Sequence, residues 1–197
     1  MKLATFYEID DGRDYAISTL HTRTDLRPAM QLYLARSYRV AEWIHPGFKQ
    51  LVFTPIKSLT DHDIQYIGHE TFVTLTRTKS KVDLHRRACA IKPPPVSHAV
   101  ECLNEEMCEK AWQSAWWGEP GNPGVATALI HPDHPVSGEG VLKKLDTLNV
   151  SDDMHSVCRD LTVEKVNGFH HHVQSPLLME NEYVDGAVLG LTEAYGC

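Results

Sequence analysis

The feature that most constrains the fold is a series of helix start and stop signals in a chain almost without strand signals. No segment sustains the alternation of apolar and polar residues that marks a half-buried strand. Pro28 stands just inside the start of one helical pattern, where its missing N–H costs nothing. Thr60 and Asp63 form the signature of a helix N-cap, and Gly68 ends that segment. These signals predict an all-α fold, an irregular multi-helix domain.

The longest predicted helix runs from residue 70 to residue 91, and the three prolines at 93–95 end it. Its basic residues are expected to lie largely in water: Arg77, Lys79, Lys81, Arg86 and Arg87. We take the triple proline as the boundary between an N-terminal multi-helix segment, residues 1–92, and a C-terminal helical segment, residues 93–197. In a chain of 197 residues, the two are expected to pack as one unit around a core that needs no disulfides.

The charge and the cysteine count narrow the range of partners and compartments. A formal net charge of −7 argues against nucleic acid or an anionic membrane as the main partner. No apolar run approaches the ~20 residues that span a bilayer, and the first residues lack the apolar stretch of a secretory signal. The five cysteines are an odd and irregularly spaced set, so metal ligands or free thiols are expected rather than disulfides. We therefore expect an intracellular protein, cytoplasmic or nuclear.

Residues 97–120 hold two of the five cysteines and three of the four tryptophans. Within this stretch Asn104 is a good N-cap, and the two glutamates that follow it suit the positive first turn of a helix. This cap places Cys102 in the loop that leads into the helix and Cys108 in the first turn. His98 precedes them in the same loop. Further along, His155 and Cys158 are three residues apart and share a face of another predicted helix.

Structural zinc takes four thiolate or imidazole ligands, usually as local sets that the fold brings together. Cys102, Cys108 and Cys158 are therefore predicted to bind one structural zinc ion, with His98 as the fourth ligand and His155 as the alternative. The competing interpretation is that these cysteines are buried free thiols, since cysteine is among the most buried residue types. The two other cysteines, Cys89 and Cys197, are expected to be structural or incidental.

The helix that Asn104 caps also determines which way its three tryptophans point. Cys108, Trp112 and Trp116 are spaced by four residues and fall on one face, whereas Trp117 points about 100° away. Core packing beside the proposed site is the expected role of this face, and a binding platform is the alternative.

Several stretches carry a resemblance to a known family. They are "LYLARSYRVAEWIHPGFKQLVFTPIKSLTDHDIQYIG", "HRRACAIKPPP" and "AWQSAWW", together with Cys102, Cys108 and Cys158. In its aromatic, proline and cysteine positions the chain resembles the region that follows the BTB domain in BTB-domain proteins of basidiomycete fungi. The resemblance covers most of the chain but not the BTB domain itself, because no strand-rich segment precedes "KLATF". It implies a helical adaptor region without catalysis and supports the structural zinc.

The sequence thus predicts a non-enzymatic protein–protein interaction module with one structural zinc; it leaves the partner and a homo-oligomeric state open. The alternative is a small metal-dependent hydrolase or nuclease that uses His131, His134 and the run 170–172. Against this alternative, adjacent histidines point in different directions and cannot all reach one ion. A Cys–His nucleophile pair of His85 and Cys89 has the right spacing, but a cysteine on an apolar helix face is more often a core thiol.

Overall fold

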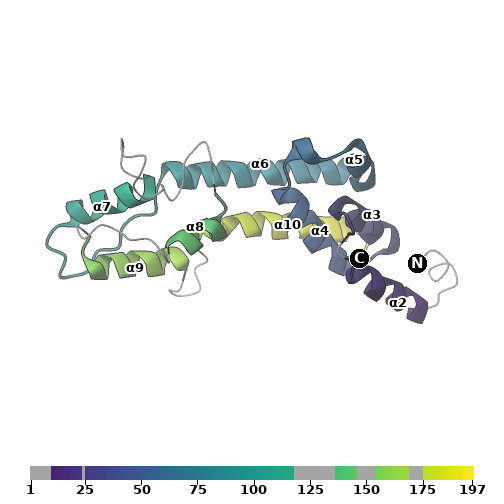
Figure 1. The fold of residues 1–197 in the computed structure, drawn as a ribbon, viewed down its shortest axis with the longest axis horizontal. Helices are drawn as coiled ribbons and strands as arrows, with labels where there is room; N and C mark the ends of the chain where they lie inside the picture. The colour runs from purple at the N-terminus through teal and green to yellow at the C-terminus, as the bar shows by residue number, and fades with distance from the viewer. Residues whose placement is uncertain (1–9, 24, 118–135, 146–153, 169–174) are drawn as a thin grey trace. The chain divides into compact units, whose positions relative to one another are not determined.

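The computed structural model describes residues 10–23, 25–117, 136–145, 154–168 and 175–197 (Figure 1). Over these ranges it contains nine α-helices, three short 3₁₀ helices and no strand, which confirms the all-α prediction. In the same ranges no helix is both long enough and apolar enough to cross a membrane.

The chain forms two compact units, and their limits differ from the boundary expected at the prolines. Unit 1 comprises residues 1–80 and 182–197, and unit 2 comprises residues 81–181. The chain thus leaves unit 1 within one long helix and returns to it within the last helix. Residues 182–197 belong to unit 1 through long-range contacts with its other residues, such as the 2.7 Å hydrogen bond between the hydroxyl groups of Thr71 and Tyr195. That the two parts pack as one unit stays a prediction.

Unit 1 is built from short helices whose limits follow local signals. Pro28 is the first residue of its helix, and Thr60 and Asp63 make both hydrogen bonds of a capping box. Gly68 ends that helix with a positive φ of 79°, a conformation that favours glycine. The elements are α2 (Asp10–His21), α3 (Pro28–Tyr38), η1 (Ala41–Trp43), α4 (Ile44–Phe53), η2 (Ile56–Ser58), α5 (Asp61–Ile67), the first part of α6 (His69–Ile91) and the last part of α10 (Met179–Tyr195).

Cationic side chains cap the carboxyl ends of three helices in unit 1. Arg13 donates to the last carbonyl of α3, Arg36 donates to the Ile67 carbonyl of α5 at 3.0 Å, and Lys79 donates to the end of α4. These carbonyl groups have no partner within their own helices, so the cations satisfy them and complement the helix dipole. Lys79 was expected to lie in water; the helix end that it caps explains its partly buried position.

Unit 2 contains the rest of α6, then α7 (Glu105–Trp117), α8 (Gly138–Leu145), α9 (Ser156–Asn167), η3 (Pro176–Leu178) and the start of α10. Arg86 was also expected in water, but its Nε lies 2.6 Å from a carboxylate oxygen of Glu180, whose side chain is 3% exposed. The same carboxylate accepts the N–H of Gly138 at 2.9 Å. This buried acid draws Arg86 inward, a long-range effect that helix periodicity does not reveal.

Candidate metal centre

The first part of the site is the loop before α7 and the first turn of α7. The N–H of Cys102 donates to the carbonyl of Ala99 at 3.0 Å and closes a turn. The Asn104 side chain accepts the N–H of Met107 at 3.0 Å, so Asn104 caps α7 as its sequence position suggests. His98 and Cys102 therefore lie in the loop, and Cys108 lies in the first turn of the helix. We refer to residues 98–108 as the cysteine loop.

The second part of the site is the first turn of α9, which lies next to α7 (Figure 1). One ligand atom from each of four residues, His98, Cys102, Cys108 and Cys158, lies within 4.8 Å of all the others. The sulfur atoms of Cys102 and Cys108 are 3.6 Å apart. Two sulfurs, each about 2.3 Å from one tetrahedral zinc ion, would be about 3.8 Å apart. The four residues that the sequence singled out are thus gathered into a cluster that could hold a metal ion.

Backbone N–H groups point at all three sulfur atoms. Ala99 donates to Cys158 at 3.2 Å, and His155 donates to Cys108 at 3.4 Å. Cys102 accepts a hydrogen bond from the N–H of Asn104. Such donors stabilise a negatively charged sulfur and are the usual surroundings of metal-bound cysteine.

The thiol pKa values reflect these competing effects. Burial would raise the pKa of Cys102, but hydrogen bonds, led by that from Asn104, leave this pKa below its ordinary value. Burial raises the pKa of Cys108 above its ordinary value, and the N–H of His155 offsets only part of that rise. A cation at the centre of the cluster would supply the remaining stabilisation that a buried thiolate needs.

His98 has a ring nitrogen that lacks a partner. Its Nδ1 is buried and accepts or donates no hydrogen bond, whereas its Nε2 lies 3.8 Å from a carboxylate oxygen of Glu109. A buried nitrogen without a partner is costly. A metal ion bound at Nδ1 would remove that cost, with the opposite nitrogen turned towards a carboxylate as in many metal sites.

His155, the alternative fourth ligand, is placed differently. It is the N-cap residue of α9, and its Nδ1 lies 3.8 Å from the sulfur of Cys158. It is not one of the four residues whose ligand atoms gather within 4.8 Å. Its backbone N–H contacts Cys108 and its imidazole contacts Cys158, but only His98 brings a ring nitrogen within 4.8 Å of all three sulfur atoms, so the geometry favours His98 as the fourth ligand.

The three tryptophans of α7 have a role that the sequence analysis missed. Their indole N–H groups donate to carbonyl oxygens at and just beyond the end of α6: Trp112 to Pro94 at 2.9 Å, Trp116 to Cys89 at 3.1 Å and Trp117 to Ala90 at 2.8 Å. Trp112 and Trp116 are also buried, as expected of core residues. The available signal was the triple proline, which ends α6 and leaves its last carbonyls in need of donors.

The other candidates that the structure describes are not among the four residues of this cluster. His85 Nε2 is 3.5 Å from the sulfur of Cys89, but burial raises the pKa of Cys89, which disfavours the thiolate of a nucleophile. Cys197 is exposed. The residues of the hydrolase alternative, His131, His134 and 170–172, fall outside the described residues, so that alternative stays a prediction.

Comparisons with models of known families, with curated proteins and with solved structures gave no significant match. The functional conclusion therefore depends on the geometry of the cluster.

Proposed function

We propose that the chain is a non-enzymatic protein–protein interaction module whose unit 2 is held together by one structural zinc ion. The ligands are His98, Cys102, Cys108 and Cys158. The observation that carries the proposal is the gathering of their four ligand atoms within 4.8 Å, with each sulfur facing a backbone N–H.

Zinc is the metal that best fits this donor set. Three thiolates and one imidazole form a common structural zinc site, and soft sulfur ligands exclude magnesium and calcium. Four protein ligands fill tetrahedral coordination and leave no position for a water molecule or a substrate. Cys108 and Cys158 are 2% and 0% exposed, which also suits a structural role.

The ion would link the cysteine loop to α9. These segments are about fifty residues apart in the chain, so the link closes a long loop and reduces the freedom of the unfolded chain. The adaptor-like role is the one that the resemblance to the post-BTB region implies. A closed metal site suits this role, because it stabilises a surface and performs no chemistry.

The test is the metal content of the untagged full-length chain, purified without added metal and measured by elemental mass spectrometry. We expect one zinc per chain, lost in Cys102→Ser and in Cys158→Ser. Cys89→Ser is the matched control, since Cys89 lies in unit 2 but outside the cluster, and it should keep the zinc. A metal-free wild-type chain, or zinc retained in both cluster variants, would overturn the proposal.

A further inference from the structure

Apolar side chains stand out from the cysteine loop. Val100 and Leu103 are each 101% exposed, as open to solvent as in an extended peptide, and Met107 is 43% exposed. We call these three residues the apolar tip. Isolated apolar residues on a surface are ordinary. Three within eight residues, two of them fully exposed and within two positions of Cys102, are not.

Local geometry explains why these side chains point outward. Val100 is a central residue of the turn that the Cys102–Ala99 hydrogen bond closes. Leu103 directly precedes the N-cap, a position from which an apolar side chain usually packs on the fourth residue of the helix. In α7 that fourth residue is Cys108, which faces the metal cluster instead. Leu103 is therefore left without its usual intrahelical contact.

Two ligands of the proposed zinc site lie within and next to the tip in the sequence. Cys102, which separates Val100 from Leu103, is a ligand in the proposed zinc site, and Cys108 directly follows Met107. With the ion bound, the tip is fixed at both ends. A fixed apolar surface loses little entropy when a partner covers it, which is how a preorganised binding surface gains affinity.

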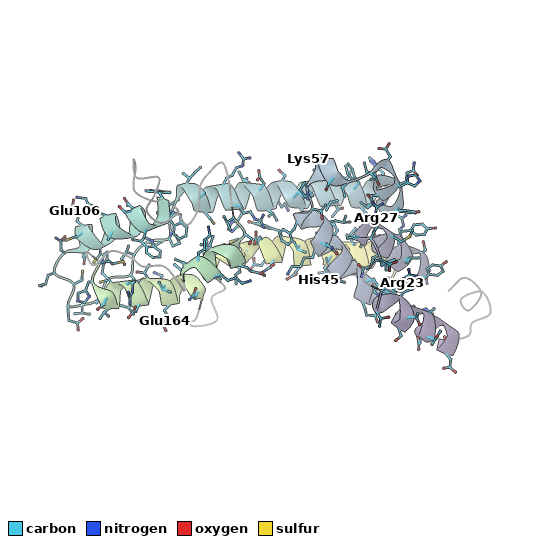
Figure 2. The ribbon with its side chains drawn as sticks, viewed as in Figure 1. Arg23, Arg27, His45, Lys57, Glu106 and Glu164 are labelled. Carbon is cyan, nitrogen blue, oxygen red and sulfur yellow. The ribbon has the colours of Figure 1, made fainter. Side chains whose placement is uncertain are left out.

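Acidic residues lie between and next to the members of the tip in the sequence. Glu101, Glu105, Glu106 and Glu109 are all exposed within the same stretch. The neighbouring cation, Lys110, pairs at 2.7 Å with Glu106, which is labelled in Figure 2. The stretch therefore keeps a net negative charge around an apolar centre. Charge complementarity selects a partner with the opposite arrangement.

We infer that the apolar tip docks a segment of a partner protein in which apolar side chains are flanked by lysine or arginine. The inference rests on the proposed function, since the zinc ion holds the tip in its presented form. Val100 and Leu103 would enter apolar contacts, and the surrounding glutamates would face the basic residues of the partner.

The experiment selects a phage-displayed peptide library on the zinc-loaded full chain and measures binding of the enriched peptides by fluorescence anisotropy. We expect peptides that combine apolar residues with lysine or arginine. Leu103→Asp should weaken their binding about tenfold or more, because a fully exposed leucine becomes buried on binding and aspartate forfeits that favourable burial. The double variant Glu101→Lys/Glu105→Lys should also weaken it, because both glutamates are exposed and neither is paired with His98. Leu84→Asp is the matched control: Leu84 is 70% exposed in unit 2 and lies outside residues 98–108, so its substitution should leave binding unchanged.

The inference is overturned if no peptide is enriched, if acidic peptides are enriched, or if the peptides bind Leu103→Asp as well as wild type. It is also overturned if sedimentation shows a dimer that Leu103→Asp dissociates, since the tip would then be an interface between copies of this chain. Zinc content separates this inference from the proposed function. If the chain binds zinc but no peptide binds at the tip, the docking inference alone is rejected. If peptides bind at the tip of a chain that holds no zinc, the proposed zinc site alone is rejected.

Discussion

The backbone N–H of Ala99 donates a 3.2 Å hydrogen bond to the sulfur of Cys158, fifty-nine residues further along the chain. A second bond, from the N–H of Ser97 to the hydroxyl of Thr162 at 2.9 Å, holds the same segment against α9. Backbone hydrogen bonds thus hold the start of the cysteine loop against α9. This places His98, between the two donors, at the edge of the cluster and makes it the residue to test first.

His98→Ala should lower the zinc affinity at least tenfold, and His155→Ala should leave it nearly unchanged. The reason is that His98 brings a ring nitrogen within 4.8 Å of all three sulfurs and its Nδ1 is buried without a hydrogen bond. His155 is not in this group, and its 3.4 Å backbone bond to Cys108 is retained by alanine. Competition with a chromogenic chelator measures both affinities. If His155→Ala lowered the zinc affinity more than His98→Ala, the fourth ligand would be His155 instead.

Metal removal should destabilise the wild-type chain and leave a chain without the site unaffected. A chelator is expected to lower the melting temperature of the wild type by about 10 °C or more, since structural zinc contributes directly to folding free energy. Cys108→Ser should melt at this lower temperature with or without chelator. Calorimetry at fixed protein concentration makes the comparison. If the chelator shifts both chains equally, its effect does not arise at this cluster.

Sequence signals predicted most of the local structure because they act over a few residues. The capping box of Thr60 and Asp63, the first position of Pro28 and the cap at Asn104 are such cases. The Asn104 cap alone placed Cys102 in a loop and Cys108 in a helix. The cluster could be anticipated as one of two alternatives, because cysteine and histidine in local sets suit a metal ion but cysteine is also a common buried residue.

Features that depend on distant contacts could not be predicted in the same way. The unit limits depend on pairs such as Thr71 and Tyr195, which are 124 residues apart. Thr71 and Thr78 are buried on α6, although their polar side chains give no apolar signal. Sequence spacing also does not specify which of His98 and His155 brings a ring nitrogen within 4.8 Å of all three sulfurs; in the structure His98 does.

Trp116→Phe should lower the free energy of unfolding by about 2 kcal/mol, because it leaves a carbonyl of α6 without its buried donor and removes ring volume. Trp116 is fully buried and donates to Cys89 at 3.1 Å. Trp117→Phe is the matched change. Trp117 is 42% exposed, so water can replace its bond to Ala90, and the expected loss is below about 1 kcal/mol. Urea unfolding measures the free energy of unfolding of both variants. Equal losses would mean that the buried indole–carbonyl hydrogen bond of Trp116 is not what stabilises this end of α6.

Arg86→Met should cost about 3 kcal/mol, because it leaves the buried carboxylate of Glu180 without its cation. The double variant Arg86→Met/Glu180→Gln should recover part of this loss, since glutamine is uncharged and can still accept the N–H of Gly138. Arg87→Met is the control, because Arg87 forms an exposed pair with Asp83 and should change stability little. A double variant no more stable than the single one would show that the charge of Glu180 is not the source of the cost.

Asp63 should make the stability of unit 1 dependent on pH in the acid range. Hydrogen bonds from the side chain and then the backbone of Thr60 hold the pKa of Asp63 below its ordinary value of 3.8, and Arg27, labelled in Figure 2, adds a favourable charge 3.3 Å away. A carboxyl group whose pKa is lower in the folded state stabilises that state fully above its unfolded pKa, and loses this contribution as the pH falls through the folded pKa. Asp63→Asn should therefore be about 1 kcal/mol less stable than wild type at neutral pH, and the difference should shrink below about pH 4.

The measurement for Asp63 is the free energy of unfolding in urea across this pH range. Asp61→Asn is the control, since Asp61 is an exposed acid in the same first turn and shares only the interaction with the helix dipole. A difference between wild type and Asp63→Asn that stays constant with pH would show that the capping box stabilises α5 through its geometry alone, without a contribution from the charge of the carboxylate.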